Sequence, residues 1–153
     1  MAEIDVFRRL LLPSTLILLV ACWLGGGVTQ DDTPVDEWLQ LLALPVLAIA
    51  AMTLMADWPK ARTVQCGIVV ALMVALVPAL QLLPLPIGWW SVPAARQAMA
   101  TDLAQAGVNA LAMHWSLSPA ATEASLWSML PALAGFFAAL ALPARQRRVL
   151  VLA

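Results

Sequence analysis

Four long, mainly apolar stretches of this chain contain no charged residue, and they constrain the fold more than any other feature. They lie at 10–30, 38–56, 63–95 and 124–144. Each is long enough to cross the hydrocarbon core of a bilayer as a helix, which takes about 20 apolar residues. The chain is 63% apolar and 11% charged, whereas soluble domains are nearer to about half and a quarter. This composition excludes a soluble enzyme, a disordered tail and a secreted disulfide scaffold.

We therefore expect an all-α, polytopic transmembrane helical bundle, with residues 1–153 forming one transmembrane region. The expected spans are 10–28, 38–57, 64–83 and 121–142. Pro84 and Pro86 are expected to end the third span, because proline lacks the amide hydrogen that a helix interior needs. The apolar residues after Arg148 look like the start of a fifth span, so we expect a fragment of a longer chain.

The basic residues predict the orientation of these spans. Seven of the eight lie before the first span, between the second and third, or after the fourth. By the positive-inside rule these ends are cytoplasmic, so we expect the amino terminus inside and the loop 84–120 outside. A net charge of −1 supplies no basic field for a nucleic acid. The expected partner is the lipid bilayer.

The tryptophans fit the same frame. They lie at or near the predicted span ends, at positions 23, 38, 58, 89, 90 and 127. Indole rings favour the headgroup level of a bilayer. We therefore expect these rings, Trp89 and Trp90 included, in two interfacial belts, with simple core filling as the alternative.

Small residues at every fourth position predict where helices approach closely. Ala71, Ala75 and Ala79 form one strip on the third span, and Gly135 and Ala139 form another on the fourth. Small side chains let helix backbones come close together in lipid. The alternative is that alanine is simply common in this chain.

The outer loop contains residues that typically start or end helices. Pro93 is expected in the first turn of a short helix that runs to Gln105 and ends at Gly107. Its weak apolar face, formed by Ala95, Met99, Leu103 and Ala106, suits a membrane surface. Ser118 is a suitable N-cap and Pro119 a suitable first residue, so the fourth helix is expected to start there.

Arg96 and His114 are the candidate substrate-binding residues of this loop. The Arg96 guanidinium matches phosphate oxygens; the alternatives are contact with lipid headgroups or a pair with Asp102. His114 has the chemistry of a general base, and the alternative is an interfacial residue beside Trp115. The chain has no Cys-x-x-Cys pair, phosphate loop or nucleophile motif, so we expect neither a metal nor another cofactor.

Cys22 and Cys66 are expected to remain unpaired, because they fall at different depths of antiparallel spans. The residues before Cys22 also look like a lipoprotein cleavage box. The apolar run continues past Cys22, and Glu3 and Asp5 dilute the basic region before it. Both features favour a retained first span.

Three segments resemble the amino-terminal part of the O-antigen ligase and polymerase-like family. They are LQLLPLP at 80–86 with Trp89 or Trp90 after it, WSLSPAAT at 115–122 and RQRR at 145–148. The resemblance covers about residues 64–153 and implies a multi-pass glycosyltransferase of the bacterial inner membrane. Such proteins transfer a glycan from a polyprenyl-pyrophosphate carrier to an acceptor on the periplasmic side.

The resemblance carries no catalytic residue to this chain, because the family's catalytic arginine and histidine lie in a later loop. It implies that residues 1–153 are scaffold and part of the periplasmic surface, inactive alone, with the glycan carrier bound by the full-length protein. The alternatives are a fragment of a transporter and a small non-enzymatic membrane assembly protein. The middle of each predicted span lacks an ionisable residue, which argues against a self-contained ion-coupled transporter.

Overall fold

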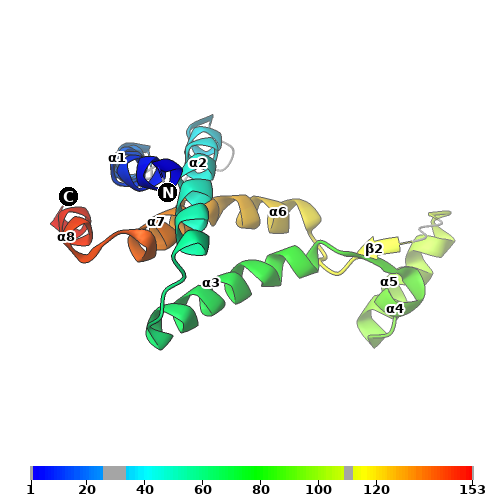
Figure 1. The fold of residues 1–153 in the computed structure, drawn as a ribbon. Helices are drawn as coiled ribbons and strands as arrows, with labels where there is room; N and C mark the ends of the chain where they lie inside the picture. The colour runs from blue at the N-terminus through cyan, green and yellow to red at the C-terminus, as the bar shows by residue number, and fades with distance from the viewer. Residues whose placement is uncertain (1, 26–33, 109–111, 153) are drawn as a thin grey trace. The chain divides into compact units, whose positions relative to one another are not determined.

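The computed structural model describes residues 2–25, 34–108 and 112–152. These residues form helices and one pair of short strands (Figure 1). The elements in chain order are α1 (Ala2–Gly25), α2 (Pro34–Ala56), α3 (Arg62–Gln81), β1 (Pro84–Pro86), α4 (Ile87–Trp90), α5 (Ala94–Gln105), β2 (Ala112–His114), α6 (Pro119–Ser128), α7 (Leu130–Ala141) and α8 (Ala144–Leu152).

The chain divides into two compact units. One comprises Met1–Leu72 and Trp127–Ala153, and the other is Met73–Leu126. The boundaries fall inside α3 and α6, so each of these helices contributes to both units.

The predicted all-helical architecture is present, and helices occupy all four predicted apolar stretches. Among the described residues, three helical stretches are long and apolar enough to cross a membrane: Pro34–Ala56, Arg62–Gln81 and Pro119–Ala141, the last comprising α6 and α7 together. The apolar part of α1 is shorter, at Arg9–Gly25. The predicted end of the first span, at residue 28, lies outside the described residues.

The fourth predicted helix, expected as one element over 121–142, is divided into α6 and α7 at Met129. Pro131 lies in the first turn of α7. Its ring has no amide hydrogen and would collide with the carbonyl four residues earlier, that of Trp127. The helical path resumes at once, because the Leu133 amide donates to the Met129 carbonyl at 2.9 Å.

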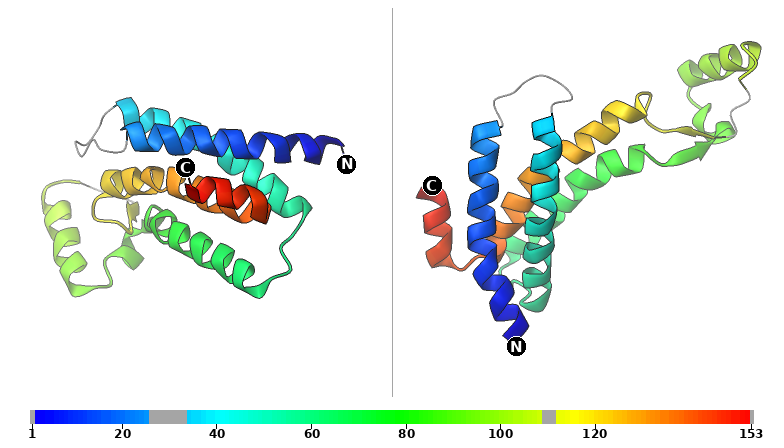
Figure 2. Two further views of the ribbon diagram at one scale, coloured as in Figure 1. Left: turned by 90° about the vertical axis from the view of Figure 1, so that its left-hand side faces the viewer. Right: turned by 90° about the horizontal axis from the view of Figure 1, so that it is seen from above.

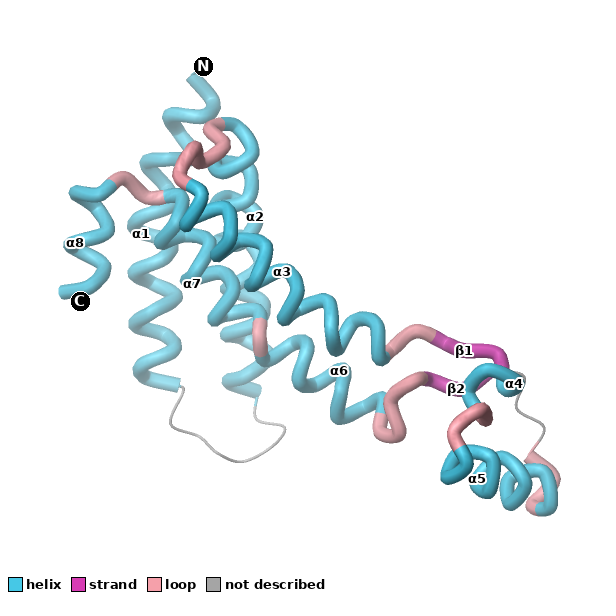
Figure 3. Tube along the Cα trace, turned by 90° about the horizontal axis from the view of Figure 1, so that it is seen from below, coloured by secondary structure: helices cyan, strands magenta, loops and turns pink. Residues whose placement is uncertain are grey.

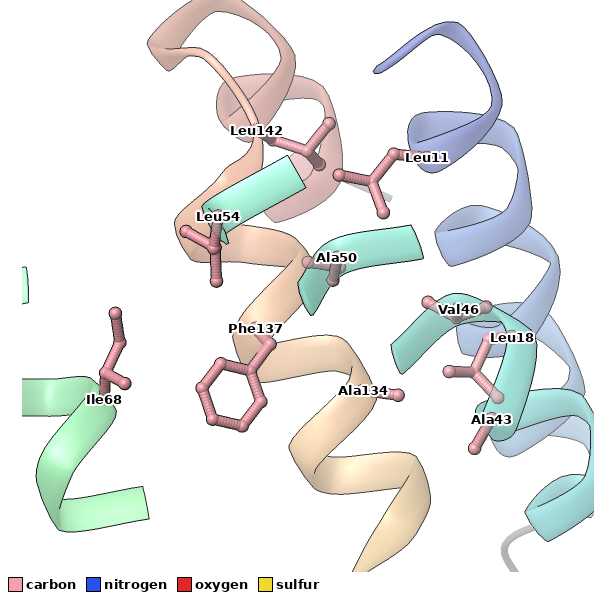
Figure 4. Close-up of a cluster of buried hydrophobic side chains, with 11 residues drawn as sticks. Leu11, Leu18, Ala43, Val46, Ala50, Leu54, Ile68, Ala134, Phe137 and Leu142 are labelled. Atoms are coloured by element: carbon pink, nitrogen blue, oxygen red, sulfur yellow. The ribbon is translucent and has the colours of Figure 1, made fainter. Parts of the chain in front are cut away.

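In the first unit α1 and α2 run antiparallel side by side, and α7 packs against both (Figure 2). Their contact buries an apolar cluster that also includes Ile68 from the first half of α3 (Figure 4). Its members are Leu11 and Leu18 of α1, Ala43, Val46, Ala50 and Leu54 of α2, Ile68, Ala134, Phe137 and Ala138 of α7, and Leu142. Phe137 lies on the side of α7 that faces Ile68.

Alanines mediate the close contact of α2 with α7. Ala43 and Ala50 on α2, and Ala134 and Ala138 on α7, are all fully buried. The predicted strip of Gly135 and Ala139 is therefore one residue out of register, and a Cβ added at Gly135 would meet nothing within 4 Å. The predicted strip on α3 is partly seen, because Ala71 packs against the cluster.

Two buried hydroxyl groups are satisfied within their own helices. Thr15 Oγ1 donates to the Leu11 carbonyl at 2.6 Å, and Thr53 Oγ1 donates to the Ile49 carbonyl at 2.7 Å. Each bond spans four residues and needs no partner from another helix. The apolar cluster is therefore held by packing.

The last helix, α8, begins after Pro143 and contains the basic residues Arg145, Arg147 and Arg148. It contacts α1. The sequence predicted apolar residues of a fifth span here, and the structure shows that the helix starts at Ala144, before the basic residues. Cys22 is half-buried and Cys66 exposed, and both are free.

Ala138→Leu should separate α2 from α7, because three added carbon atoms have no space at a fully buried contact. We expect a loss of about 1–3 kcal/mol in the free energy of unfolding, measured by titrating the lipid-reconstituted chain with dodecyl sulfate. Ala132→Leu is the matched control, since Ala132 is exposed on the same helix. Equal stability of the two variants would contradict the assigned contact.

Candidate functional site

The candidate site lies in the segment 84–118, which we call the cap module. Its frame is an antiparallel pair in which Leu85 of β1 faces Met113 of β2. The pairing continues beyond the strands, since the Trp115 amide donates to the Leu83 carbonyl at 3.4 Å and the Ser116 amide to the Gln81 carbonyl at 2.8 Å. The end of α3 is thereby joined to the residues that lead into α6 (Figure 3).

Trp90 anchors the short helix α4 to this frame. Its side chain is 2% exposed, and its indole N–H donates to the His114 carbonyl at 2.8 Å. Buried indole groups generally find such a partner for the N–H. The expectation that Trp90 belongs to an interfacial belt is therefore wrong, because this ring is a packed part of the cap module.

Arg96 acts on the same ring from α5. Its guanidinium carbon lies 5.4 Å from the centroid of the Trp90 ring, within the range of a cation–π contact. Its Nη2 donates to the Trp115 carbonyl at 2.8 Å. Among the described residues no ion pair joins Arg96 to Asp102. In place of that predicted pair, Arg96 contacts the Trp90 ring and the Trp115 carbonyl.

The half-buried residues of α5 and its predicted lipid-facing residues share only Leu103. Arg96, Ala100 and Leu103 are half-buried, whereas Ala95, Met99 and Ala106 are exposed. Arg96 is the half-buried residue that lies over the Trp90 ring. The predicted helix end is confirmed, because Gly107 has a φ of 78° and the Val108 amide donates to the Leu103 carbonyl at 2.9 Å. This arrangement is a Schellman motif.

The two predicted site residues, Arg96 and His114, meet at Trp90 without forming a catalytic pair. Arg96 contacts the ring, and the backbone carbonyl of His114 accepts the hydrogen bond from the indole N–H. The His114 side chain is exposed. The arrangement thus gives both residues a positioning role in the cap module.

A pocket of about 530 Å³ lies beside this anchor. Its lining is mainly apolar, from Trp90, Met99, Leu103, Ala106, Met113, Leu117 and Pro119, with Asp102, His114 and Ser116 as polar groups. The volume falls in the usual range for small-molecule sites. Such a pocket suits an apolar ligand that also donates hydrogen bonds to the Asp102 carboxylate.

Ser116 is a structural residue that the sequence analysis missed. Its hydroxyl lies 2.6 Å from Thr122 Oγ1 and accepts from the Ser118 amide at 3.1 Å. These bonds shape the turn before α6, which begins at Pro119 as predicted. The spacing of Ser116, Ser118 and Thr122 was the available signal.

Within the part of the chain that the structure describes, no group of three or more histidine, cysteine or acidic side chains is placed to hold a metal ion. Comparison of the chain with known proteins found no matching family model, no matching curated protein and no matching solved structure.

Arg96→Ala should loosen the cap module, because it removes the cation over the Trp90 ring and the bond to the Trp115 carbonyl. We expect a local loss of about 1–2 kcal/mol, measured as faster hydrogen exchange of the Trp115 and Ser116 amides. Gln97→Ala is the control, since Gln97 is exposed on the same helix. If exchange were equally slow in both variants, Arg96 would have no role in holding the module.

Proposed function

We propose that this chain is the membrane-embedded amino-terminal region of a multi-pass bacterial inner-membrane protein of the O-antigen ligase and polymerase type. In this proposal its helices are scaffold, and the cap module forms part of the periplasmic surface. The whole protein transfers a polyprenyl-pyrophosphate-linked glycan to an acceptor. We assign no catalytic residue to this chain.

The outward apolar surface of the helices is the observation that carries the membrane part of this proposal. Only 6% of the apolar window of α3 is buried inside the molecule. On its first half Val69, Val70 and Leu72 are exposed, although the same segment places Ile68 in the apolar cluster. Lipid tails cover such a surface at no cost, whereas water does not.

The family part of the proposal rests on the resemblance of two segments that pair in the structure. The segments that carry the resemblance, 80–86 and 115–122, are far apart in sequence. In the structure they come together, because Trp115 and Ser116 pair with the carbonyls of Leu83 and Gln81. In this proposal the two motifs act as one structural element of the family.

The distribution of basic residues supports a cytoplasmic amino terminus and carboxyl end. Arg9 lies on α1 and Arg145 on α8, whereas Lys60 lies between α2 and α3 and Arg62 is the first residue of α3. Under the positive-inside rule these positions share the cytoplasmic side. The cap module then lies in the periplasm, where Arg96 is the single basic residue.

Reporter fusions test the orientation. Alkaline phosphatase, which is active only outside the cytoplasm, should be active when fused after Gly107 and inactive when fused after Lys60. A green fluorescent reporter should give the opposite pattern. Because α3 separates the two fusion points, the same side for both would refute the proposed crossing of α3.

Deletion of the gene that encodes the chain tests the glycan part. We expect the surface glycan to lose its transferred unit while the polyprenyl-linked precursor accumulates, as measured by gel electrophoresis and mass spectrometry of extracted lipids. Residues 1–153 supplied alone should not restore transfer. Unchanged glycan after deletion would contradict the assignment and favour a transporter or an assembly protein.

A further inference from the structure

The short helix α4 holds two adjacent tryptophans in opposite environments. Trp90 is 2% exposed, whereas Trp89 is 76% exposed. Val92 is 77% exposed and lies one turn from Trp89, since its amide donates to the Trp89 carbonyl at 3.4 Å. Trp89 and Val92 are two exposed apolar residues joined by this backbone turn at the end of α4, and we call them the α4 corner.

The anchoring of Trp90 fixes the direction of the α4 corner. The bond from the Trp90 indole to the His114 carbonyl and the packing of α4 on both strands prevent α4 from turning over. Trp89 is thus held outward by its neighbour. The indole of Trp89 is therefore available for contact with a surface outside the cap module.

The charge pattern indicates which kind of surface the α4 corner fits. No charged residue occurs between Arg62 and Arg96. Arg96 directs its guanidinium toward the Trp90 ring and the Trp115 carbonyl, so this cation is already engaged inside the module. The α4 corner therefore offers a partner an indole N–H and apolar area without a formal charge.

The short connection to α3 limits where the corner lies. Residues 82–86 separate the end of α3 from α4, and five extended residues reach about 17 Å. If α3 crosses the membrane, α4 stays close to the bilayer surface. An uncharged corner with one indole at that level matches the headgroup layer, where the ring is apolar and its N–H is hydrated.

We propose that the α4 corner, Trp89 and Val92, inserts into the headgroup layer of the periplasmic leaflet and holds the cap module against the membrane. This inference rests on the proposed membrane function. It separates the tandem tryptophans into a structural residue, Trp90, and a lipid-contacting residue, Trp89. Because the corner carries no charge, its insertion does not depend on anionic lipid.

Site-specific fluorescence in lipid vesicles tests the inference. The full chain carries Cys22→Ala and Cys66→Ala, with one new cysteine labelled by an environment-sensitive nitrobenzoxadiazole dye. The probe position is Val92→Cys, the matched control is Gln97→Cys on α5, and the reference is Val77→Cys on the exposed side of α3. Shallow and deep spin-labelled phosphatidylcholine quench from the lipid, and iodide quenches from the water.

We expect the Val92 dye to be quenched by the shallow lipid label and to be several-fold less accessible to iodide than the Gln97 dye. Replacing part of the phosphatidylcholine by phosphatidylglycerol should leave the lipid quenching unchanged. Trp89→Ser should increase iodide access at Val92, and Trp89→Phe should preserve most of the protection.

Equal iodide access at Val92 and Gln97 would overturn the inference. Protection from iodide without quenching by lipid would overturn it too, because a protein surface would then cover the corner. The Val77 dye separates this failure from that of the membrane proposal. If the deep lipid label quenches the Val77 dye, the proposed membrane crossing of α3 stands whatever the Val92 dye shows. If it does not, the proposed crossing itself is refuted.

Discussion

Helices with apolar side chains on every side impose the main physical constraint on this chain. The apolar cluster buries one side of α2 and α7, but Val69, Val70 and Leu72 on α3 remain exposed beside the buried Ile68. Backbone hydrogen bonds are satisfied inside each helix, so the helices need only an apolar surrounding. In lipid there is no hydrophobic gain from bringing such surfaces together, and close backbone approach takes its place. The buried alanines of α2 and α7 provide that approach.

The sequence was sufficient to predict the long helices and several of their ends. Charge-free stretches determine where apolar helices form, and backbone chemistry determines where they stop. Gly107 has the positive φ that ends α5, and Pro119 starts α6. These features are local, because each depends on the conformational preference of one residue or on the spacing of neighbouring charges.

The features that depend on distant residues were not predictable in the same way. Small residues were expected to mark helix contacts, but the burial of Ala134 and Ala138 instead of Gly135 depends on the rotation of α7 against α2. The strand pair was missed because Pro84 and Pro86 leave Leu85 as the only amide donor of β1. Prolines normally argue against a strand, and the pairing is completed by Trp115 and Ser116 beyond β2.

At the candidate site, the contacts of Arg96 in the structure differ from those that the sequence predicted. Arg96 is the single basic residue between Arg62 and Arg145, and the sequence offered it a phosphate, lipid headgroups or Asp102 as a partner. In the structure its contacts are a ring face and a carbonyl, both neutral. This cation lies over the ring of Trp90, which the bond to the His114 carbonyl and the packing of α4 on the strands hold inside the cap module. Trp89, next to it in the chain, remains the exposed ring.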